Sequence, residues 1–532
     1  MKLHYMSRLA VVGALLALSA TSAEAAPPAD LDARMGEVLA ATNTPGAALA
    51  IVENGVVTAS RGYGVAQLDG NRKVGEHTLF AIGSTGKAIT AAAIATLVDQ
   101  GKLGWDDKVV DHLPDFQMYD PWVTREMTIR DLLVHRSGLG RGAGDLLFVP
   151  RTDLSRAESV RRLRHLKPAT SFRSGYAYDN VLYMVLGEVI RAKTGQTWED
   201  YTQDKVLRAA GMRDAVTDEA RRFARDDRAF PHGRMSGSVR GVGDLRRLDE
   251  RSATLAPNVA PAGGVSASAA DLGRWLQVQL GQGKTPDGGR VYSEAAAWQM
   301  WTPQVVVPIR RQPAPITATT PLFHNYALGW NVRDYRGQMV IYHFGTVPGF
   351  KSVVVLLPLK NVGFALALNS EEDSAVQGMM YELLDHYLDA PKANWPQAFM
   401  TLEAKQRAQA VEQMEKVAAA PAKVGPSLSL DRYAGRFADP WFGPITVRAE
   451  NGQLMLDFKK EHPGVTGRLE HFQYDTFVTR WQDPTIEPAY VTFVLGPTGK
   501  VDRITMRAVS PMAGFSYDYQ DLAFTPITPA KP

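Results

Sequence analysis

The chain has 532 residues, of which 45% are hydrophobic and 22% charged, and this composition is that of a globular protein rather than a disordered chain. The formal charge of +3 is too small for a nucleic-acid-binding surface, so no nucleic-acid partner is expected. Cysteine is absent, which excludes disulfide bonds, thiolate metal sites and a cysteine nucleophile.

The amino terminus is typical of a secretory signal peptide over residues 1–25. Lys2 and Arg8 form its positive region, an apolar stretch follows, and Ala23-Glu24-Ala25 is a small-residue cleavage pattern. We expect an exported protein, periplasmic or secreted, whose mature chain begins at Ala26. The apolar stretch is short for a membrane span, and no later stretch reaches about 18 apolar residues, so no stable membrane insertion is expected. An uncleaved amino-terminal anchor is the alternative.

A β-hairpin is predicted to open the mature fold. Residues 47–53 and 56–59 flank Asn54-Gly55, a dipeptide that supplies the positive φ angles of a tight turn. Leu79 to Gly83 then leads into a helix whose apolar residues recur at three- and four-residue spacing. The residues on that face are Ile94, Leu97 and Val98.

Helices dominate the predicted middle of the chain, and strands return after it. A helical stripe over 182–190 stops at Thr194-Gly195, and Ser268 with Asp271 forms a capping box that opens another helix. Strands are predicted over 342–344, 352–357 and 363–368, the first two flanking a turn region that contains Gly345, Pro348 and Gly349. Both ends of this domain are therefore expected to build one sheet.

The composition changes after Pro391. Residues 397–420 have a charged, alanine-rich helical pattern, which ends at Pro421 and a linker-like segment. From about Leu430 the pattern is one of hairpins, with turns at Asn451-Gly452 and 496–499. We therefore predict a first domain over 26–390, a helix and linker over 391–428, and a small antiparallel β-domain over 429–532, which suits a length prior of roughly 150 residues per domain.

Ser84-Thr85-Gly86-Lys87 is the first motif that carries chemistry. Residues three apart share a helix face, so the S-x-x-K spacing places an amine beside a hydroxyl. A desolvated lysine has a lowered pKa and can take the serine proton as a general base. A phosphate-binding loop would need glycine at Ala81, and a G-x-S-x-G elbow would need glycine at Ile82, so neither motif is present.

Two further motifs follow in order along the chain. Tyr178-Asp179-Asn180 precedes the predicted helix over 182–190, and His343-Phe344-Gly345 lies in a predicted strand followed by Thr346. This arrangement resembles the serine β-lactamase and penicillin-binding-protein superfamily, in its class C-like branch, where S-x-x-K, Y-x-N and a K-T-G or H-x-G triplet line one cleft. The resemblance covers about Leu31 to Leu388.

Three supporting stretches are similar to the same branch. They are Leu132-Leu133-Val134-His135-Arg136-Ser137-Gly138-Leu139, Pro261-Ala262-Gly263-Gly264-Val265-Ser266 and Tyr326-Ala327-Leu328-Gly329-Trp330. His135 lies near Ser137 and could suggest a classical triad partner. We interpret it as part of a structural turn, because Lys87 already fills the role of the base.

The resemblance implies an α/β fold, with an antiparallel sheet flanked by helices, a helical subdomain and a small carboxy-terminal β-barrel-like domain. It implies Ser84 as nucleophile, Lys87 as its base and Tyr178 as acid and base toward the leaving group and water. Asn180 would donate to the acyl side chain, and the N–H groups of Ser84 and Thr346, on the strand of Gly345, would bind the oxyanion. No cofactor and no metal is implied.

His343 is the departure that bears on substrate, because classical β-lactamases carry lysine there. Imidazole is mostly neutral at pH 7 and offers one donor and one acceptor, so a substrate carboxylate is less favoured than with a permanent cation. Family members with H-x-G are often peptidases, amidases or esterases. We therefore predict an exported serine hydrolase acting on a small-molecule or peptide substrate, most simply a peptidase or amidase.

Three alternatives remain open at this point. The chain could be a carboxylesterase, a β-lactamase, or a penicillin-recognising binder or sensor that is acylated with little turnover. The carboxy-terminal domain could cap the cleft, dock a partner or simply stabilise the fold. The sequence does not determine the substrate or the oligomeric state.

Overall fold

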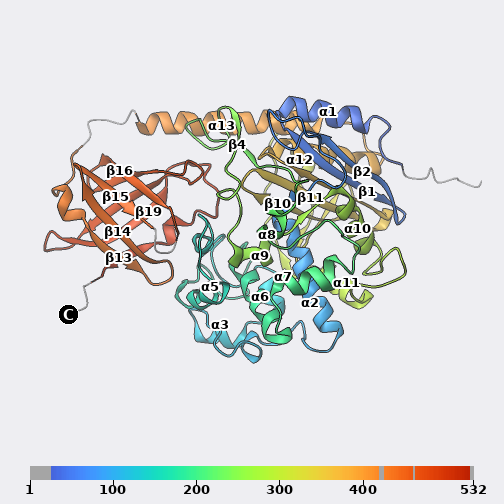
Figure 1. Cartoon of the computed structure of the whole chain (residues 1–532), viewed down its shortest axis with the longest axis horizontal. Coiled ribbons are helices and arrows are strands. Elements are labelled where there is room, and N and C mark those ends of the chain that lie inside the picture. Colours follow the sequence, from blue (N-terminus) through green and yellow to red (C-terminus); the bar gives the residue numbers. More distant parts are fainter. Residues whose placement is uncertain (1–25, 419–423, 459–461, 528–532) are drawn as a thin grey trace, which may run out of the picture.

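The computed structural model describes residues 26–418, 424–458 and 462–527, so the predicted signal peptide lies outside the described residues. It shows a mixed α/β domain and a carboxy-terminal β-barrel, with helix α13 (Trp395–Ala418) running along the top of Figure 1 from the first toward the second. The predicted α/β fold with a β-rich carboxy-terminal domain is confirmed. No helix in the described residues is long and apolar enough to cross a membrane.

An eight-stranded antiparallel sheet is the centre of the first domain. The amino-terminal hairpin lies in this sheet because β1 pairs with β12, from Ala47 opposite Leu368 to Glu53 opposite Val362. Both ends of the domain therefore build one sheet, as predicted. The strands, in spatial order, are β2 (Val56–Gly64), β1 (Gly46–Glu53), β12 (Val362–Leu368), β11 (Phe350–Leu357), β10 (Gln338–Val347), β9 (Asn331–Tyr335), β8 (His324–Tyr326) and β7 (Val305–Val306).

Helices cover both faces of the sheet. Alternate residues of a strand point to opposite faces, and along β11 Val353 and Val355 pack in the core with α1 and α12, whereas Val354 and Leu356 pack in the core with α2 and α10. Every residue of β12 is buried for the same reason. The sheet is thus the middle layer of three.

The helices begin and end as follows: α1 (Leu31–Thr42), α2 (Lys87–Asp99), α3 (Pro121–Glu126), α4 (Ile129–Leu133), α5 (Arg156–Arg162), α6 (Val181–Thr194), α7 (Trp198–Thr202), α8 (Glu219–Phe223), α9 (Ala260–Gly263), α10 (Ala269–Leu280), α11 (Glu294–Trp301) and α12 (Asp373–Tyr387). Two short ribbons lie outside the main sheet: β3 (Phe80–Ala81) with β6 (Ser266–Ala267), and β4 (His232–Arg234) with β5 (Leu245–Arg247).

Local sequence signals placed several elements correctly. Asn54 and Gly55 have φ of 51° and 80° at the first hairpin turn, Gly195 ends α6 with φ of 72°, and Ser268 with Asp271 forms the predicted capping box of α10. One expectation was wrong. The strand predicted over 342–344 does not end there but continues through Gly345, opposite Ser352 of β11, to Val347 at the end of β10, so the turn after it is shorter than predicted.

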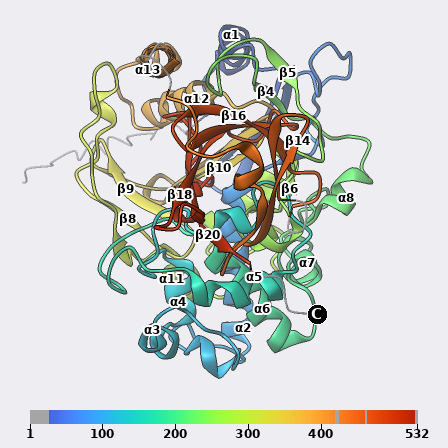
Figure 2. The same ribbon diagram turned by 90° about the vertical axis from the view of Figure 1, so that its left-hand side faces the viewer.

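The carboxy-terminal domain is a closed antiparallel barrel, in which β20 pairs with β13 and so leaves no open edge. Aromatic side chains fill much of its interior, including Tyr433, Phe437, Phe442, Phe458, Phe477, Phe493 and Phe524. Its strands are β13 (Gly435–Asp439), β14 (Gly443–Glu450), β15 (Gln453–Asp457), β16 (Thr466–Gln473), β17 (Thr476–Trp481), β18 (Ala489–Leu495), β19 (Val501–Ala508) and β20 (Ala523–Pro526). Viewed from the barrel side, it stands in front of the first domain (Figure 2).

Candidate active site

Ser84 and Lys87 lie side by side where a short 3₁₀ turn, η1 (Gly83–Gly86), runs directly into α2. Side chains at i and i+3 eclipse in a 3₁₀ turn, which brings the pair closer than an α-helix would. Lys87 Nζ is 3.2 Å from Ser84 Oγ. Ser84 remains partly exposed, whereas Lys87 is fully buried.

Burial lowers the pKa of Lys87 to about 7, and the nearby Asp145 carboxylate only partly offsets this. Lys87 Nζ donates to Asn180 Oδ1 at 2.7 Å and to the Ala262 carbonyl at 3.0 Å. A neutral amine has two hydrogens and one lone pair. With both hydrogens engaged by these acceptors, the lone pair is left for the proton of Ser84.

The strand expected to carry the oxyanion site runs against the nucleophile turn. Gly83 has φ of 53°, and a Cβ there would lie 2.8 Å from the backbone nitrogen of Thr346. A Cβ at Gly345 would lie 1.9 Å from the Ile82 carbonyl oxygen. Both glycines are thus required by the close approach of β10 to η1. The N–H of Ser84 belongs to the first turn of its helix, whose N–H groups have no partner within the helix.

Tyr178 joins Ser84 and Lys87 from the segment before α6. Its ring lies 4.8 Å from Lys87 Nζ, and its hydroxyl is buried without a hydrogen-bond partner in the described residues. Burial raises the pKa of Tyr178 well above its usual value, an effect that the neighbouring Ser84 hydroxyl reduces. Tyr178 is therefore a neutral phenol at neutral pH.

His343 also lies in the site, but both of its ring nitrogens have protein partners. Nδ1 lies 2.6 Å from the Phe344 carbonyl oxygen, so it carries the proton, and Nε2 accepts from the Tyr326 hydroxyl at 2.9 Å. Burial lowers the pKa of His343 to about 3, with a further contribution from Lys87. The imidazole is neutral, as expected, yet its one donor is directed to the backbone rather than to a substrate.

Asn180 connects Lys87 to a carboxyl group that the sequence motifs did not include. While Oδ1 accepts from Lys87, Nδ2 donates to Asp145 Oδ2 at 2.9 Å. Asp145 is fully buried in η3 (Asp145–Leu147), and burial raises its pKa to about 7. Asn180 thus holds the amine in the structure, and its expected contact with an acyl side chain stays a prediction.

Each of the three supporting stretches contributes a contact to this site. Ala262 accepts from the Lys87 amine, and Tyr326 donates to His343. A Cβ at Gly329 would lie 2.9 Å from the Lys87 carbonyl oxygen, which explains the glycine of the third stretch. His135 is buried beside the Tyr178 ring, with 4.2 Å between centroids, and its Nδ1 accepts from the Asp179 N–H.

A family model described as Beta-lactamase matches residues 31–387. The chain belongs to the β-lactamase family. A second model, described as a domain of unknown function (DUF3471), matches residues 419–526. The resemblance to the serine β-lactamase and penicillin-binding-protein superfamily is therefore confirmed.

Curated relatives and solved structures agree with this membership. The unguisins hydrolase ungD′ of Aspergillus campestris is 29% identical over 450 residues, which cover 80% of this chain and 79% of the relative. Penicillin-binding protein 4 of Amycolatopsis lactamdurans is 31% identical over 337 residues, which cover 62% and 81%. The octameric penicillin-binding protein homologue from Pyrococcus abyssi has a TM-score of 0.57 at 18% identity, covering 90% of this chain and 98% of that one, and shows the same fold.

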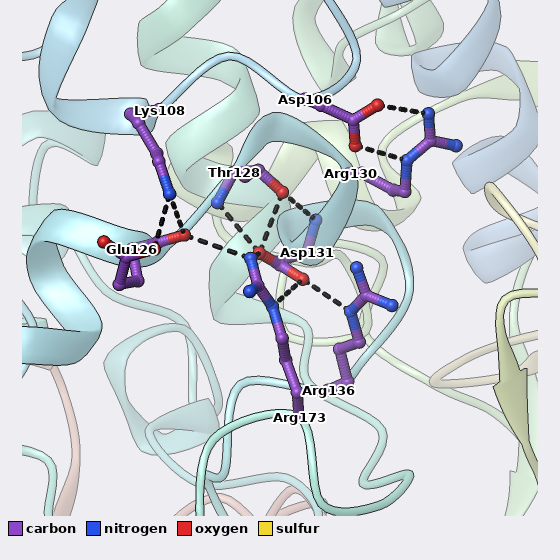
Figure 3. A network of polar contacts seen from close by, with 8 residues as sticks. All are labelled: Asp106, Lys108, Glu126, Thr128, Arg130, Asp131, Arg136 and Arg173. Atoms are coloured by element: carbon purple, nitrogen blue, oxygen red, sulfur yellow. Dashed lines mark hydrogen bonds and ion pairs between the residues drawn. The ribbon is translucent and has the colours of Figure 1, made fainter.

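In this β-lactamase-family chain, an ion-pair network joins α4 to the segment that precedes Tyr178, and Figure 3 shows the residues of this network. Asp131 is buried in α4, where it forms a capping box with Thr128 and pairs with the guanidinium groups of Arg136 and Arg173. Arg173 N also donates to the Arg136 carbonyl at 3.0 Å, which ties the segment leading to Tyr178 to the turn that follows α4. Neighbouring pairs in Figure 3 are Lys108 with Glu126 and Asp106 with Arg130.

Sequence reasoning missed Asp145 and the carboxy-terminal residue that contacts it. Ser516 donates to Asp145 Oδ2 at 2.6 Å, across 371 positions of sequence. No periodicity or short motif joins two residues so far apart. The only local signal was the polar character of Asp145 between the apolar residues that surround it.

Proposed function

We propose that this protein is a serine hydrolase that cleaves an amide bond through an acyl-enzyme on Ser84. One observation carries the proposal: a buried amine, with its pKa lowered to about 7, lies 3.2 Å from a partly exposed serine hydroxyl. A base with a pKa near the working pH is the most effective proton acceptor. Named relatives that are hydrolases support the same reaction class.

In the acylation half, Ser84 Oγ attacks the amide carbonyl carbon while its proton passes to Lys87 Nζ. The N–H groups of Ser84 and Thr346 stabilise the oxyanion of the tetrahedral intermediate. The C–N bond then breaks, and the leaving nitrogen takes a proton from the Tyr178 hydroxyl, which regains one from Lys87. The neutral state of Tyr178 suits it to donate at this step.

Deacylation uses the same groups in reverse. A water molecule attacks the ester carbonyl, and its proton passes to Tyr178 as the Tyr178 proton passes to Lys87. The C–Oγ bond breaks, and Ser84 Oγ takes its proton back from Lys87. The free carboxylic acid leaves, and each group returns to its starting state.

Small peptides are the proposed substrate class, and simple esters are the second. The neutral His343 offers no cation to a substrate carboxylate. Lys351, on the strand that pairs with the oxyanion strand, donates to Thr346 Oγ1 at 3.2 Å and pairs with Asp373 at 2.9 Å, which balances its charge. A neutral acyl chain therefore fits this strand better than an anionic one, which disfavours a classical β-lactam substrate.

The nucleophile is tested by time-resolved labelling with a fluorophosphonate and peptide mapping of the adduct. We expect one equivalent bound to Ser84 and none bound to Ser84→Ala. Ser174→Ala is the matched control, because Ser174 is an exposed serine of the same domain. Labelling of Ser84→Ala at the wild-type rate would exclude the mechanism.

Turnover and location are tested separately. Matched amide and ester pairs incubated with purified protein should give many equivalents of product, faster for peptides than for esters. Product that stops at one equivalent would favour a penicillin-recognising sensor instead. Export is also part of the proposal, and sequencing of the protein recovered outside the cytoplasm should find Ala26 as its first residue.

A further inference from the structure

The loop between β19 and β20 extends from the barrel and contacts the first domain. Asp518, fully buried in this loop, accepts the N–H of Gly144 at 2.7 Å and the N–H of Leu146 at 3.0 Å. These two donors flank Asp145. A buried carboxyl group that accepts two neighbouring backbone N–H groups fixes the orientation of that backbone, because those N–H groups have no water to bond to instead. Asp518 therefore sets the position of η3, and with it the direction of the Asp145 side chain.

A second contact from the same loop reaches the Asp145 carboxyl itself. Ser516 Oγ donates to Asp145 Oδ2 at 2.6 Å, and Asn180 Nδ2 donates to the same oxygen at 2.9 Å. Asn180 Oδ1 in turn accepts from Lys87 Nζ at 2.7 Å. A continuous row of hydrogen bonds thus joins a barrel residue to the amine beside Ser84.

Phe515 adds an apolar contact at the same place. Its ring lies 5.9 Å from that of Tyr178, centroid to centroid, in an edge-to-face arrangement. A Cβ at Gly142 would lie 2.6 Å from the Phe515 carbonyl oxygen, so only glycine allows the two segments to approach this closely. The barrel loop therefore packs directly against the active site.

We propose that Ser516 is a positioning residue of the active site, which fixes the Asp145 carboxylate so that Asn180 holds the Lys87 amine against Ser84. The inference rests on the proposed function, since it assigns a purpose to that amine. It makes the carboxy-terminal barrel part of the active site and not a separate appendage. Stabilisation of the fold alone does not require a hydroxyl that donates to the buried carboxyl group linked, through Asn180, to the base.

The electrostatic consequence has a definite sign. Asp145 is faced by Lys87, Tyr178, Asp179 and Asp518, and of these only Lys87 favours its ionised form. The Ser516 hydroxyl stabilises the carboxylate as well, and the carboxylate stabilises the protonated form of Lys87. Loss of the hydroxyl should therefore raise the pKa of Asp145 and lower that of Lys87, leaving a weaker base.

The test is the rate of fluorophosphonate labelling of Ser84 across pH 5–9 in the full-length chain. The Ser516→Ala variant should be labelled about tenfold more slowly than the wild-type protein at pH 7. The acidic limb of its pH profile, where the labelling rate falls because Lys87 becomes protonated, should move to lower pH. The Ser516→Thr variant, which keeps the hydroxyl, should have the labelling rate and the pH profile of the wild-type protein. Gln520→Ala is the control, because Gln520 is exposed four residues further along the chain. A purely structural role would lower the rate without moving the limb.

The outcomes separate this inference from the proposed function. If the wild-type protein is not labelled at Ser84, the proposed function fails. If it is labelled, but Ser516→Ala has the wild-type rate and pH profile, or Ser516→Thr is impaired as much as Ser516→Ala, the positioning role is overturned. Should Ser516→Ala fail to fold, Ser516→Cys takes its place, since a thiol of similar size is a weak donor and should give the same shift.

Discussion

Replacing Lys87 by methionine should change the pH dependence of stability in a way that the structure fixes in sign and size. The pKa of Lys87 falls from 10.5 to about 7 on burial. Between these values the unfolded chain binds a proton at Lys87 that the folded chain does not, so Lys87 contributes a rise in the free energy of unfolding of about 1.4 kcal/mol per pH unit. Methionine has a similar length and does not titrate, so this rise is absent from the variant.

From pH 7.5 to pH 9.5, the wild-type protein should therefore gain about 3 kcal/mol of unfolding free energy relative to Lys87→Met. The coupling to Asp145 acts in the same direction. Without the neighbouring cation, the Asp145 carboxyl keeps its proton to higher pH, so the variant loses stability as pH rises. At any one pH, the difference in unfolding free energy between the two proteins also includes the cost of leaving the acceptors of the Lys87 amine unpaired in the methionine variant. The change of that difference with pH is therefore the quantity to measure.

The assay is urea unfolding followed by tryptophan fluorescence at the two pH values. Lys392→Met is the control, because the Lys392 side chain is 89% exposed and forms only a surface ion pair, with Asp30, among the described residues. Its difference from the wild-type protein should not change with pH. A difference that is equally flat for Lys87→Met would mean that Lys87 stays protonated when buried, and the proposal that it is the base for Ser84 would be refuted.

Three further predictions follow from the site. Tyr178→Phe removes a buried hydroxyl that has no hydrogen-bond partner in the described residues, so thermal denaturation should show unchanged stability. Steady-state turnover should nevertheless fall by about 10² to 10⁴, and a matching loss of stability would contradict this prediction. Gly345→Ala places a Cβ 1.9 Å from the Ile82 carbonyl oxygen and should displace the oxyanion strand, lowering the labelling rate by about 10² or more; near-normal labelling would show that this strand is not used. His343→Lys buries a second ammonium near the first, so urea unfolding should show a loss of about 1–3 kcal/mol and the acidic limb of labelling should move to lower pH; an unmoved limb would mean that residue 343 does not influence the base.

Short-range chemistry is what the sequence predicted well. The S-x-x-K spacing places Ser84 and Lys87 together because residues three apart lie on one side of any helical turn, and Asn54-Gly55 specifies its hairpin because the turn needs positive φ at both residues. The fold class and the family could also be predicted, since the motifs occur in a fixed order along the chain. Each of these inferences depends on short stretches of sequence, or on the order in which such stretches occur, and a pattern can encode both.

Only the tertiary structure could decide how far the base is buried and what holds it. The burial that lowers the pKa of Lys87 follows from its place at the start of α2, a helix whose residues from Lys87 to Leu97 are all buried. The direction of the His343 proton depends on where Phe344 and Tyr326 lie. The link from Ser516 to Asp145 joins two domains across 371 positions. Such contacts depend on how whole elements pack together, so no local pattern of residues predicts them.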